Sequence, residues 1–238
     1  MKVTAYIEKF LKSKGIDTIF VLQGGMITRI IDEIHQQGNI NIVSVHHEQA
    51  AAMAADAYAR VKNKPGVALA TSGPGATNLI TGIGNCFFDS VPAIFITGQV
   101  NLNEQKGDRP IHQLGFQETD IVSIVRPITK AAYAIKRAED IPYLLEEAYR
   151  MAMEGRPGPV LLDIPMNIQY EECTDFKEIS EFPQNVNDDS KEGEKFIEQF
   201  IEAFKTSKKP LLLVGRGIRV SIAIKEIRQL ISKLNIPT

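Results

Sequence analysis

Short apolar runs alternate with helical patterns over the first two thirds of the chain. Buried strands are predicted from these runs at Thr18–Leu22, Ile40–Val45, Gly66–Ala70, Ala93–Thr97 and Pro159–Ile164. Helical spacing of apolar residues predicts helices at the start of the chain, up to about Gln37, over Gln49–Val61, from about Ala76, and over Asp140–Glu154. This alternation is typical of an α/β fold, a parallel sheet with helices on both faces.

The pattern changes after residue 169. Residues 170–191 are acidic and polar, and we expect them to form an exposed linker. Residues 192–238 predict a helix to about Thr206, a strand at Leu211–Val214 and a helix at Ser221–Leu234. Fewer than 50 residues cannot bury both faces of a sheet, so we expect this second α/β unit to be truncated. The predicted organisation is a first domain over 1–169, a linker over 170–191 and the beginning of a second domain over 192–238.

Composition and charge exclude several classes of protein. The 238 residues are 44% hydrophobic, which is enough for a core, and the net charge of −2 argues against a nucleic-acid partner. Two cysteines, Cys86 and Cys173, do not make a disulfide framework and favour the reducing cytoplasm. The first residues form an amphipathic pattern rather than a signal peptide, and no apolar run has the length of a membrane span. We therefore expect a cytoplasmic protein with no membrane partner.

Glu48 is the foremost candidate for chemistry. It stands where a predicted strand meets an alanine-rich helix, and open α/β sheets bind ligands at the carboxyl ends of their strands. The alternative is a glutamate that caps the first turn of its own helix, and spacing alone leaves both interpretations open. His46 and His47 precede Glu48, but no second His or Cys pair stands at metal-ligand spacing, so a zinc site is not indicated.

Glycine-rich turns follow two of the predicted strands. Residues Ser72–Asn78 read SGPGATN, which lacks the third glycine of a dinucleotide fingerprint and the lysine of a P-loop. A tight strand-to-helix turn is therefore favoured over a dinucleotide site. Gly24-Gly25 permits either a close approach of another group or a simple turn. The polar stretch Asn101–Asp120 is long for a connection inside a domain, and such loops are often functional.

Seven strings in a fixed order carry a family resemblance. They are Gly24-Gly25, HHEQAAAMAADAYAR (46–60), PGVALATSGPGATN (65–78), DSVPAIFITGQV (89–100), GFQETDIV (115–122), ITKAAYAI (128–135) and GRPGPVLLDIP (155–165). Together they resemble the N-terminal part of thiamine diphosphate-dependent enzymes, with the acetolactate synthase branch as the best match. The resemblance runs to about Gln169 and continues at KPLLLVGRGI (209–218), which is similar to the start of that family's central domain.

The resemblance implies a role for each matching residue. Glu48 falls on the glutamate that bonds the aminopyrimidine ring and drives proton removal from the thiazolium carbon, so it is the implied catalytic residue. Gly24, Gly25, Pro74 and Asn78 are the implied cofactor-binding residues beside it. Phe116 and Gln117 match the substrate-side loop, and His112 stands roughly where keto-acid decarboxylases carry a histidine pair.

The resemblance also implies cofactors and partners. Thiamine diphosphate is the expected cofactor, and the substrate class is a 2-keto acid. Magnesium is expected on ligands of a C-terminal domain, because the Gly-Asp-Gly motif that binds diphosphate and magnesium is absent here. FAD in the central domain stays open, since no residue here indicates it. The family's site forms between subunits, so we expect a homodimer or homotetramer, and we expect this chain alone to be inactive.

Departures from the family pattern keep rival functions open. The glycine pair lacks the proline that synthases carry before it, and the loop KGDRPIHQLG (106–115) differs from the usual type. A carboligase of acetolactate synthase type is the first hypothesis. A related 2-keto acid decarboxylase or acyl transferase is the second, and a non-catalytic module of the same fold is the third. Retention of Glu48 argues against the third.

Overall fold

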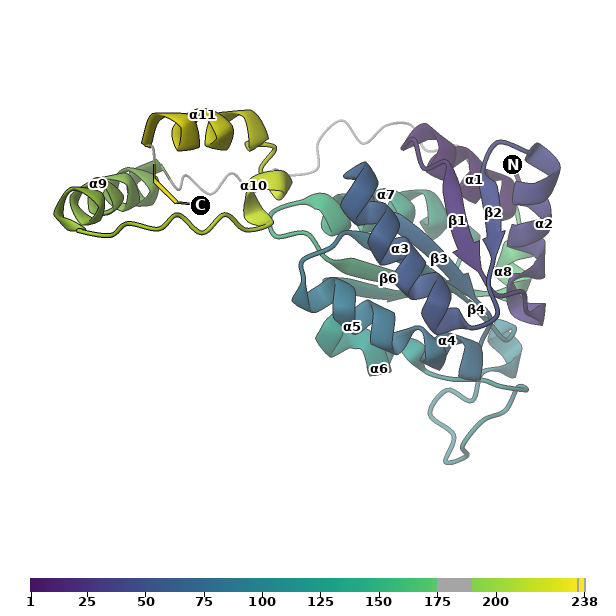
Figure 1. Cartoon of the computed structure of the whole chain (residues 1–238). Helices are drawn as coiled ribbons and strands as arrows, with labels where there is room; N and C mark the ends of the chain where they lie inside the picture. The colour runs from purple at the N-terminus through teal and green to yellow at the C-terminus, as the bar shows by residue number, and fades with distance from the viewer. Residues whose placement is uncertain (175–189, 235, 238) are drawn as a thin grey trace. The chain divides into compact units, whose positions relative to one another are not determined.

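The chain divides into two compact units, unit 1 (Met1–Glu178) and unit 2 (Ile179–Thr238). The computed structural model describes residues 1–174, 190–234 and 236–237, and Figure 1 traces them. Most of the predicted linker over 170–191 lies outside the described residues. Unit 1 contains every strand of the described chain, so it carries the fold that positions the site.

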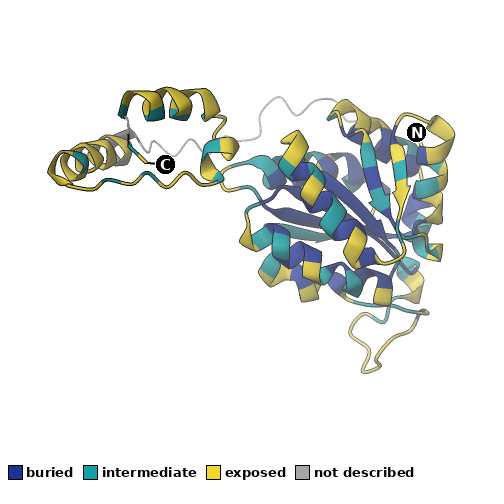
Figure 2. Ribbon diagram, in the orientation of Figure 1, coloured by how far each residue is buried: buried dark blue, intermediate teal, exposed yellow. Residues whose placement is uncertain are grey.

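A six-stranded parallel sheet forms the centre of unit 1. Its strands stand in the order β2-β1-β3-β4-β6-β5, and every pair is parallel. The bounds are β1 Thr18–Val21, β2 Asn41–Ser44, β3 Gly66–Ala70, β4 Ala93–Gln99, β5 Ala131–Ala134 and β6 Pro159–Pro165. β3, β4 and β6 are buried along their whole length (Figure 2), which explains why their residues are mostly apolar. The predicted α/β fold with a parallel sheet is confirmed.

Helices cover both faces of this sheet. Those of unit 1 are α1 Val3–Ser13, α2 Thr28–Gln37, α3 Glu48–Lys62, α4 Pro74–Asn78, α5 Ile80–Phe88, α6 Ile121–Val125, α7 Ile141–Met153 and α8 Met166–Tyr170. Short 3-10 turns lie at Gly25–Ile27, Leu102–Glu104, Arg126–Ile128 and Ala138–Asp140. Successive residues of a strand point to opposite faces of the sheet, so they pack into two separate hydrophobic cores. Ile94 and Ile96 of β4 pack with α1, α2 and α7, whereas Ala93 and Phe95 pack with α3, α5 and α6.

The alanine-rich sequence of α3 allows a close approach to its neighbours. Ala51, Ala52, Ala55 and Ala59 are buried on one side of the helix. A Cβ added to Gly82 of α5 would stand 2.2 Å from the Cβ of Ala52, so α3 and α5 meet at a distance that only small residues permit. This packing holds the first turn of α3, and with it Glu48, firmly against the sheet.

Two elements differ from the sequence prediction. β5 was not predicted, because Ala131–Ala134 is only four residues long and three of them are alanine, yet it pairs with β6 at the edge of the sheet. The predicted strand at Leu211–Val214 is wrong, since no described residue there pairs in a sheet and a single backbone bond joins Leu212 to Pro237. A strand needs a neighbour for its N–H and C=O groups, and none is present among the described residues of unit 2.

The described residues of unit 2 form three helices, α9 Ser190–Thr206, α10 Gly217–Val220 and α11 Ile224–Leu234. The helix predicted over Ser221–Leu234 is present but begins later, at Ile224, because Ile222 adopts a left-handed φ of 59°. None of the apolar side chains described in this unit is buried, as the exposed helices in Figure 2 show. No helix in the described part of the chain is long and apolar enough to cross a membrane.

Candidate functional site

The candidate residues gather where β1, β2 and β3 end. Gly24-Gly25 follows β1, Glu48 opens α3 after β2, and the turn Thr71–Gly73 follows β3. β1 stands between β2 and β3 in the sheet, and the crossover helices α2 and α3 lie on opposite faces. The chain therefore reverses its direction of travel across the sheet at this point, which is where open α/β sheets bind ligands.

His47, and not Glu48, caps the first turn of α3. The His47 imidazole Nδ1 accepts a hydrogen bond from the backbone N–H of Gln49 at 3.1 Å, and His47 itself has an extended backbone. Capping satisfies one of the free N–H groups at the helix start. The interpretation of Glu48 as the cap of its own turn is therefore wrong, and its buried carboxylate needs another explanation.

The Glu48 carboxylate lies across the site against Asn78. Glu48 is 7% exposed, and its Oε2 accepts a hydrogen bond from Asn78 Nδ2 at 2.9 Å. No described residue donates to the other oxygen, Oε1, which lies 3.2 Å from the place that a Cβ on Gly75 would occupy. One oxygen is thus held by Asn78, and the other accepts no hydrogen bond from a described residue.

Glycine is required at Gly24 and Gly75 because Thr71 lies against both. A Cβ on Gly24 would stand 2.4 Å from the Cβ of Thr71, and one on Gly75 would stand 2.8 Å from its Cγ2. The Thr71 hydroxyl accepts a hydrogen bond from the backbone N–H of Met26 at 3.2 Å, which ties the β1 turn to the β3 turn. Gly25 differs, since a Cβ there would meet nothing within 4 Å. The absence of a side chain at Gly25 therefore leaves open space beside this turn.

The segment with Phe116 and Gln117 lies on the β3 turn. Gly73 has a left-handed φ of 63°, and a Cβ on it would stand 2.7 Å from the Cβ of Gln117. Gln117 also has a positive φ, 61°, which is uncommon outside glycine. Phe116 is 74% exposed. Pro74, also exposed, begins α4 directly after Gly73. The sequence-predicted residues Gly24, Glu48, Pro74, Asn78 and Gln117 are thus brought to one end of the sheet.

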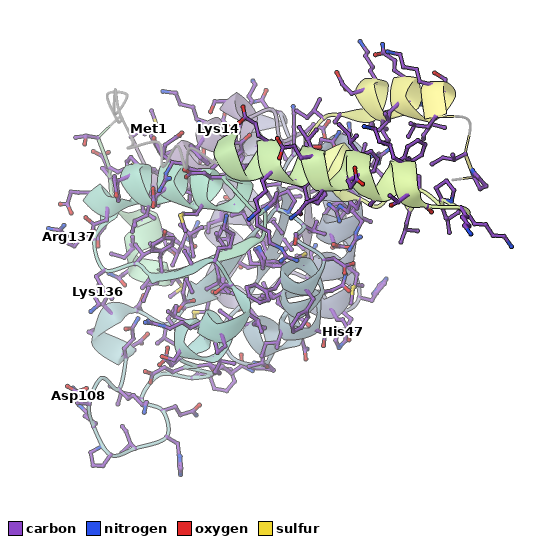
Figure 3. All side chains as sticks on the ribbon, turned by 90° about the vertical axis from the view of Figure 1, so that its left-hand side faces the viewer. Met1, Lys14, His47, Asp108, Lys136 and Arg137 are labelled. Atoms are coloured by element: carbon purple, nitrogen blue, oxygen red, sulfur yellow. The ribbon has the colours of Figure 1, made fainter. Side chains whose placement is uncertain are left out.

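His112 is the candidate that makes no contact with this group. It is exposed within the polar loop, and no hydrogen bond joins it to another described side chain. The loop projects from the body of unit 1, with Asp108 near its end (Figure 3). Its base is ordered by Glu118, whose carboxylate accepts hydrogen bonds from the backbone N–H groups of Lys106 at 2.7 Å and Leu114 at 2.8 Å.

Two polar residues at the strand ends were missed from the sequence. Ser72 is buried, and its hydroxyl has no hydrogen-bond partner in the described structure. Asp163 is a buried carboxyl in the otherwise apolar strand β6. A polar residue in an apolar strand was the available signal for Asp163, because buried polar groups carry a cost that selection normally removes. Nothing local distinguished Ser72 from an ordinary turn residue.

The residues present fit a polar heteroaromatic ring. Glu48 Oε1 offers an acceptor, Ser72 offers a buried hydroxyl without a partner, and Gly25 leaves room for a group to approach the backbone. Among the described residues no group of three His, Cys, Asp or Glu side chains is placed to hold a metal ion.

Comparison with known proteins identifies the family. Residues 1–124 match the model of the thiamine pyrophosphate enzyme, N-terminal TPP binding domain. The chain belongs to the thiamine pyrophosphate enzyme family. The matched residues include Gly24 after β1, Glu48 at the start of α3, Asn78 at the end of α4 and the Phe116–Gln117 segment. The predicted resemblance is confirmed.

Named relatives indicate which branch of this family the chain is similar to. The acetolactate synthase large subunit of Haemophilus influenzae is 40% identical over 233 residues, which cover 95% of this chain and 39% of the relative. The chloroplastic acetolactate synthase of Arabidopsis thaliana is 41% identical over 209 residues, covering 87% of this chain and 30% of the relative. The acetolactate synthase isozyme 2 large subunit of Escherichia coli is 34% identical over 237 residues, which cover 100% of this chain and 41% of the relative. The chain thus spans about two fifths of the length of such relatives.

Proposed function

We propose that this chain is the cofactor-activating part of a thiamine diphosphate-dependent carboligase of acetolactate synthase type. The observation that carries the proposal is the Glu48 carboxylate, buried at the switch point with Oε2 held by Asn78 and Oε1 free. The named relatives, all acetolactate synthases, support the same branch. The substrate would be a 2-keto acid such as pyruvate, with a second carbonyl compound as acceptor.

Glu48 would share a proton with a ring nitrogen of the aminopyrimidine through Oε1. A carboxylate suits this task because it can hold a proton against a weakly basic nitrogen. Asn78 fixes the orientation of the carboxylate through Oε2, and burial would strengthen a hydrogen bond between Oε1 and the ring nitrogen. When bound, thiamine diphosphate supplies the acidic carbon and the electron sink that decarboxylation of a 2-keto acid requires. Gly24, Gly25 and Pro74 would leave the cofactor side of the site open, and Phe116, Gln117 and His112 would face the substrate.

The remaining components belong to the intact protein. Magnesium and the diphosphate would be held by a C-terminal part of the protein, as the family pattern implies. A flavin in the central domain has no support in these residues. The intact protein would be a homodimer or homotetramer, because α3 presents the apolar residues Ala50, Ala57 and Val61 outward and exposed.

Substitution of Glu48 in the full-length protein tests the proposal. We expect Glu48→Gln to lower kcat for acetolactate formation from pyruvate by about 10²–10⁴-fold, the usual range for a positioned proton-transfer group. Proton–deuterium exchange at the reactive carbon of bound cofactor should slow in parallel. The measurements are steady-state kinetics and NMR exchange, each with saturating thiamine diphosphate and magnesium.

His47→Ala is the matched control for the Glu48 experiment. It removes the cap of α3, so it should cost about 1 kcal/mol of stability and leave kcat within about twofold. Normal turnover and normal exchange in Glu48→Gln would refute the assignment. A wild-type protein that releases an aldehyde instead of joining two substrates would favour the rival decarboxylase.

A further inference from the structure

A second polar cluster lies at the carboxyl end of β4 and β6, outside the site built around Glu48. Asp163 of β6 is in register with Thr97 of β4 and is 5% exposed. Thr97 Oγ1 donates to its Oδ1 at 2.6 Å, and Gln99 Nε2 donates to its Oδ2 at 2.9 Å. Burial raises the pKa of Asp163 to about 7 in spite of these two donors. A carboxyl kept in an apolar strand at such a cost calls for a function.

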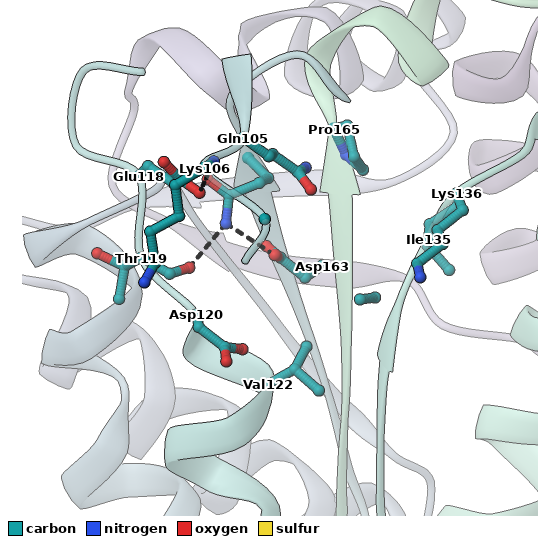
Figure 4. A pocket seen from close by; sticks show the side chains of 13 residues that line it. Gln105, Lys106, Glu118, Thr119, Asp120, Val122, Ile135, Lys136, Asp163 and Pro165 are labelled. Carbon is teal, nitrogen blue, oxygen red and sulfur yellow. Dashed lines mark hydrogen bonds between the residues drawn. The ribbon is translucent and has the colours of Figure 1, made fainter. Parts of the chain in front are cut away.

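Gln99 extends the cluster from the sheet to the loop. Its Nε2 also donates to the backbone carbonyl of Thr119 at 2.8 Å, and its Oε1 accepts from the N–H of Val100 at 3.0 Å. In Figure 4 the two bonds made by Nε2 are the dashed lines that reach Thr119 and Asp163. The Gln99 amide is thereby fixed on both sides, with the Asp163 carboxyl setting its orientation.

Thr119 belongs to the segment that carries Phe116 and Gln117. In the described structure, the bond from Gln99 to Thr119 is the one hydrogen bond between residues 115–120 and a strand. Two residues earlier the backbone of Gln117 lies on Gly73, in the turn next to Glu48. A continuous set of contacts therefore runs from Asp163 through Gln99 and Thr119 to the candidate site.

A cavity of about 180 Å³ lies beside these groups. Its walls include Gln99, Glu118, Thr119, Asp120 and Asp163. Well-packed segments stay in place when one hydrogen bond is lost, because neighbouring atoms prevent movement. Here the open volume gives residues 118–120 room to shift, so the bond from Gln99 contributes to their position together with the bonds that Glu118 and Asp120 accept.

We propose that Asp163 is a positioning residue that acts through Gln99 to hold the Phe116–Gln117 segment against the Gly73 turn. The inference rests on the proposed function in one respect: Phe116 and Gln117 are taken to face the substrate. Glu48 and Asn78 are not members of this set of contacts, so cofactor activation is independent of it. Loss of the link should therefore weaken substrate binding more than turnover.

Gln99→Leu in the full-length protein breaks the link, since leucine donates to neither Thr119 nor Asp163. We expect amide hydrogen exchange in residues 115–121 to become about tenfold faster, as the loss of one buried hydrogen bond predicts. KM for pyruvate should rise about tenfold, with kcat changed by less than about threefold. Asp163→Asn keeps the shape of the side chain and removes its charge. It should raise the exchange rate in residues 115–121 and the KM for pyruvate by about threefold each.

Thr97→Val is the matched control. It removes the other hydrogen bond of Asp163 and leaves the bond from Gln99 to Thr119 in place. Thr97→Val and Gln99→Leu should both lower the stability of the protein. Only Gln99→Leu and Asp163→Asn should change the KM for pyruvate and the amide hydrogen exchange in residues 115–121. Equal effects in Thr97→Val and Gln99→Leu would show a general structural role and overturn the proposal, as would unchanged exchange in Gln99→Leu. Faster exchange with an unchanged KM would overturn it too.

The two proposals fail in different ways. A wild-type protein without activity on pyruvate contradicts the proposed function, whereas the exchange measurement needs no activity and still decides whether Asp163 holds the segment through Gln99.

Discussion

At the scale of single residues, Thr71 decides where glycine is needed at the candidate site. Gly24 faces the Thr71 side chain at a distance that excludes a Cβ, whereas Gly25 faces open space. The two neighbouring glycines therefore have different reasons to be glycine. Gly24 serves the packing of the turn after β1, and no contact within the described structure requires Gly25. We therefore expect a bound group to lie against Gly25.

Alanine at each position of the full-length protein separates these reasons. Gly24→Ala should lower the free energy of unfolding by about 1–3 kcal/mol, because the methyl group is forced against Thr71. Gly25→Ala should change it by less than about 0.5 kcal/mol, yet reduce the affinity for thiamine diphosphate about tenfold. Urea unfolding and calorimetry with magnesium measure the two quantities. Unchanged cofactor affinity in Gly25→Ala would remove Gly25 from the proposed site.

At the scale of elements, β6 carries a carboxyl that titrates within the sheet. The pKa of Asp163 is raised from 3.8 to about 7, first by burial and also by the charge of Asp120. Other charged groups on the walls of the adjoining cavity are Lys106, Glu118 and Lys136. The folded protein therefore keeps a proton that the unfolded chain releases above pH 3.8. Stability from this group is present at acid pH and is lost as the pH rises to about 7.

Asp163→Asn removes this titration. The melting temperature of the variant, relative to wild type, should increase as the pH rises from 3.8 to about 7 and should stay constant above that range. The direction follows because wild type pays for ionising a buried carboxyl and asparagine does not. Thermal unfolding by circular dichroism over this pH range measures the difference. A constant difference between the two proteins would show that Asp163 ionises normally.

At the scale of the whole molecule, α3 has apolar residues on both sides. Ala51, Ala52 and Ala55 face the core, while Ala50, Ala57 and Val61 are exposed. A helix that is apolar all round is normally buried on all sides. We therefore expect the outward face of α3 to contact a second copy of the protein.

Sedimentation of the full-length protein tests this contact. The wild type should sediment at two or more times its chain mass. Ala57→Glu places a charge on the exposed face without disturbing the core, so it should raise the dissociation constant at least about tenfold. His35→Glu, on the exposed surface of α2, is the control and should leave association unchanged. A monomeric wild type at high concentration, or equal effects of the two variants, would contradict the prediction.

The sequence by itself determined the elements that repeat apolar residues with a clear period. β3, β4 and β6 are mostly apolar over four or more successive residues, and α3 follows a helical period, so local spacing was enough to predict them. Glu48 could be recognised because the boundary between β2 and α3 is also local. β5 was not predicted, since three alanines and one tyrosine carry no periodic signal. Leu211–Val214 was predicted as a strand because an apolar run does not reveal whether a neighbouring strand exists.

Only the tertiary structure decided which groups meet. Asn78 is 30 residues from Glu48, Asp163 is 64 from Gln99, and Gln117 reaches Gly73 from a different loop. These contacts arise from the order of strands in the sheet and from the directions of the crossover helices. The spacing of residues along the chain shows neither the strand order nor the helix directions, because hydrogen bonds and close packing depend on distance in space. The role of His47 as the cap of α3 was decided in the same way by geometry.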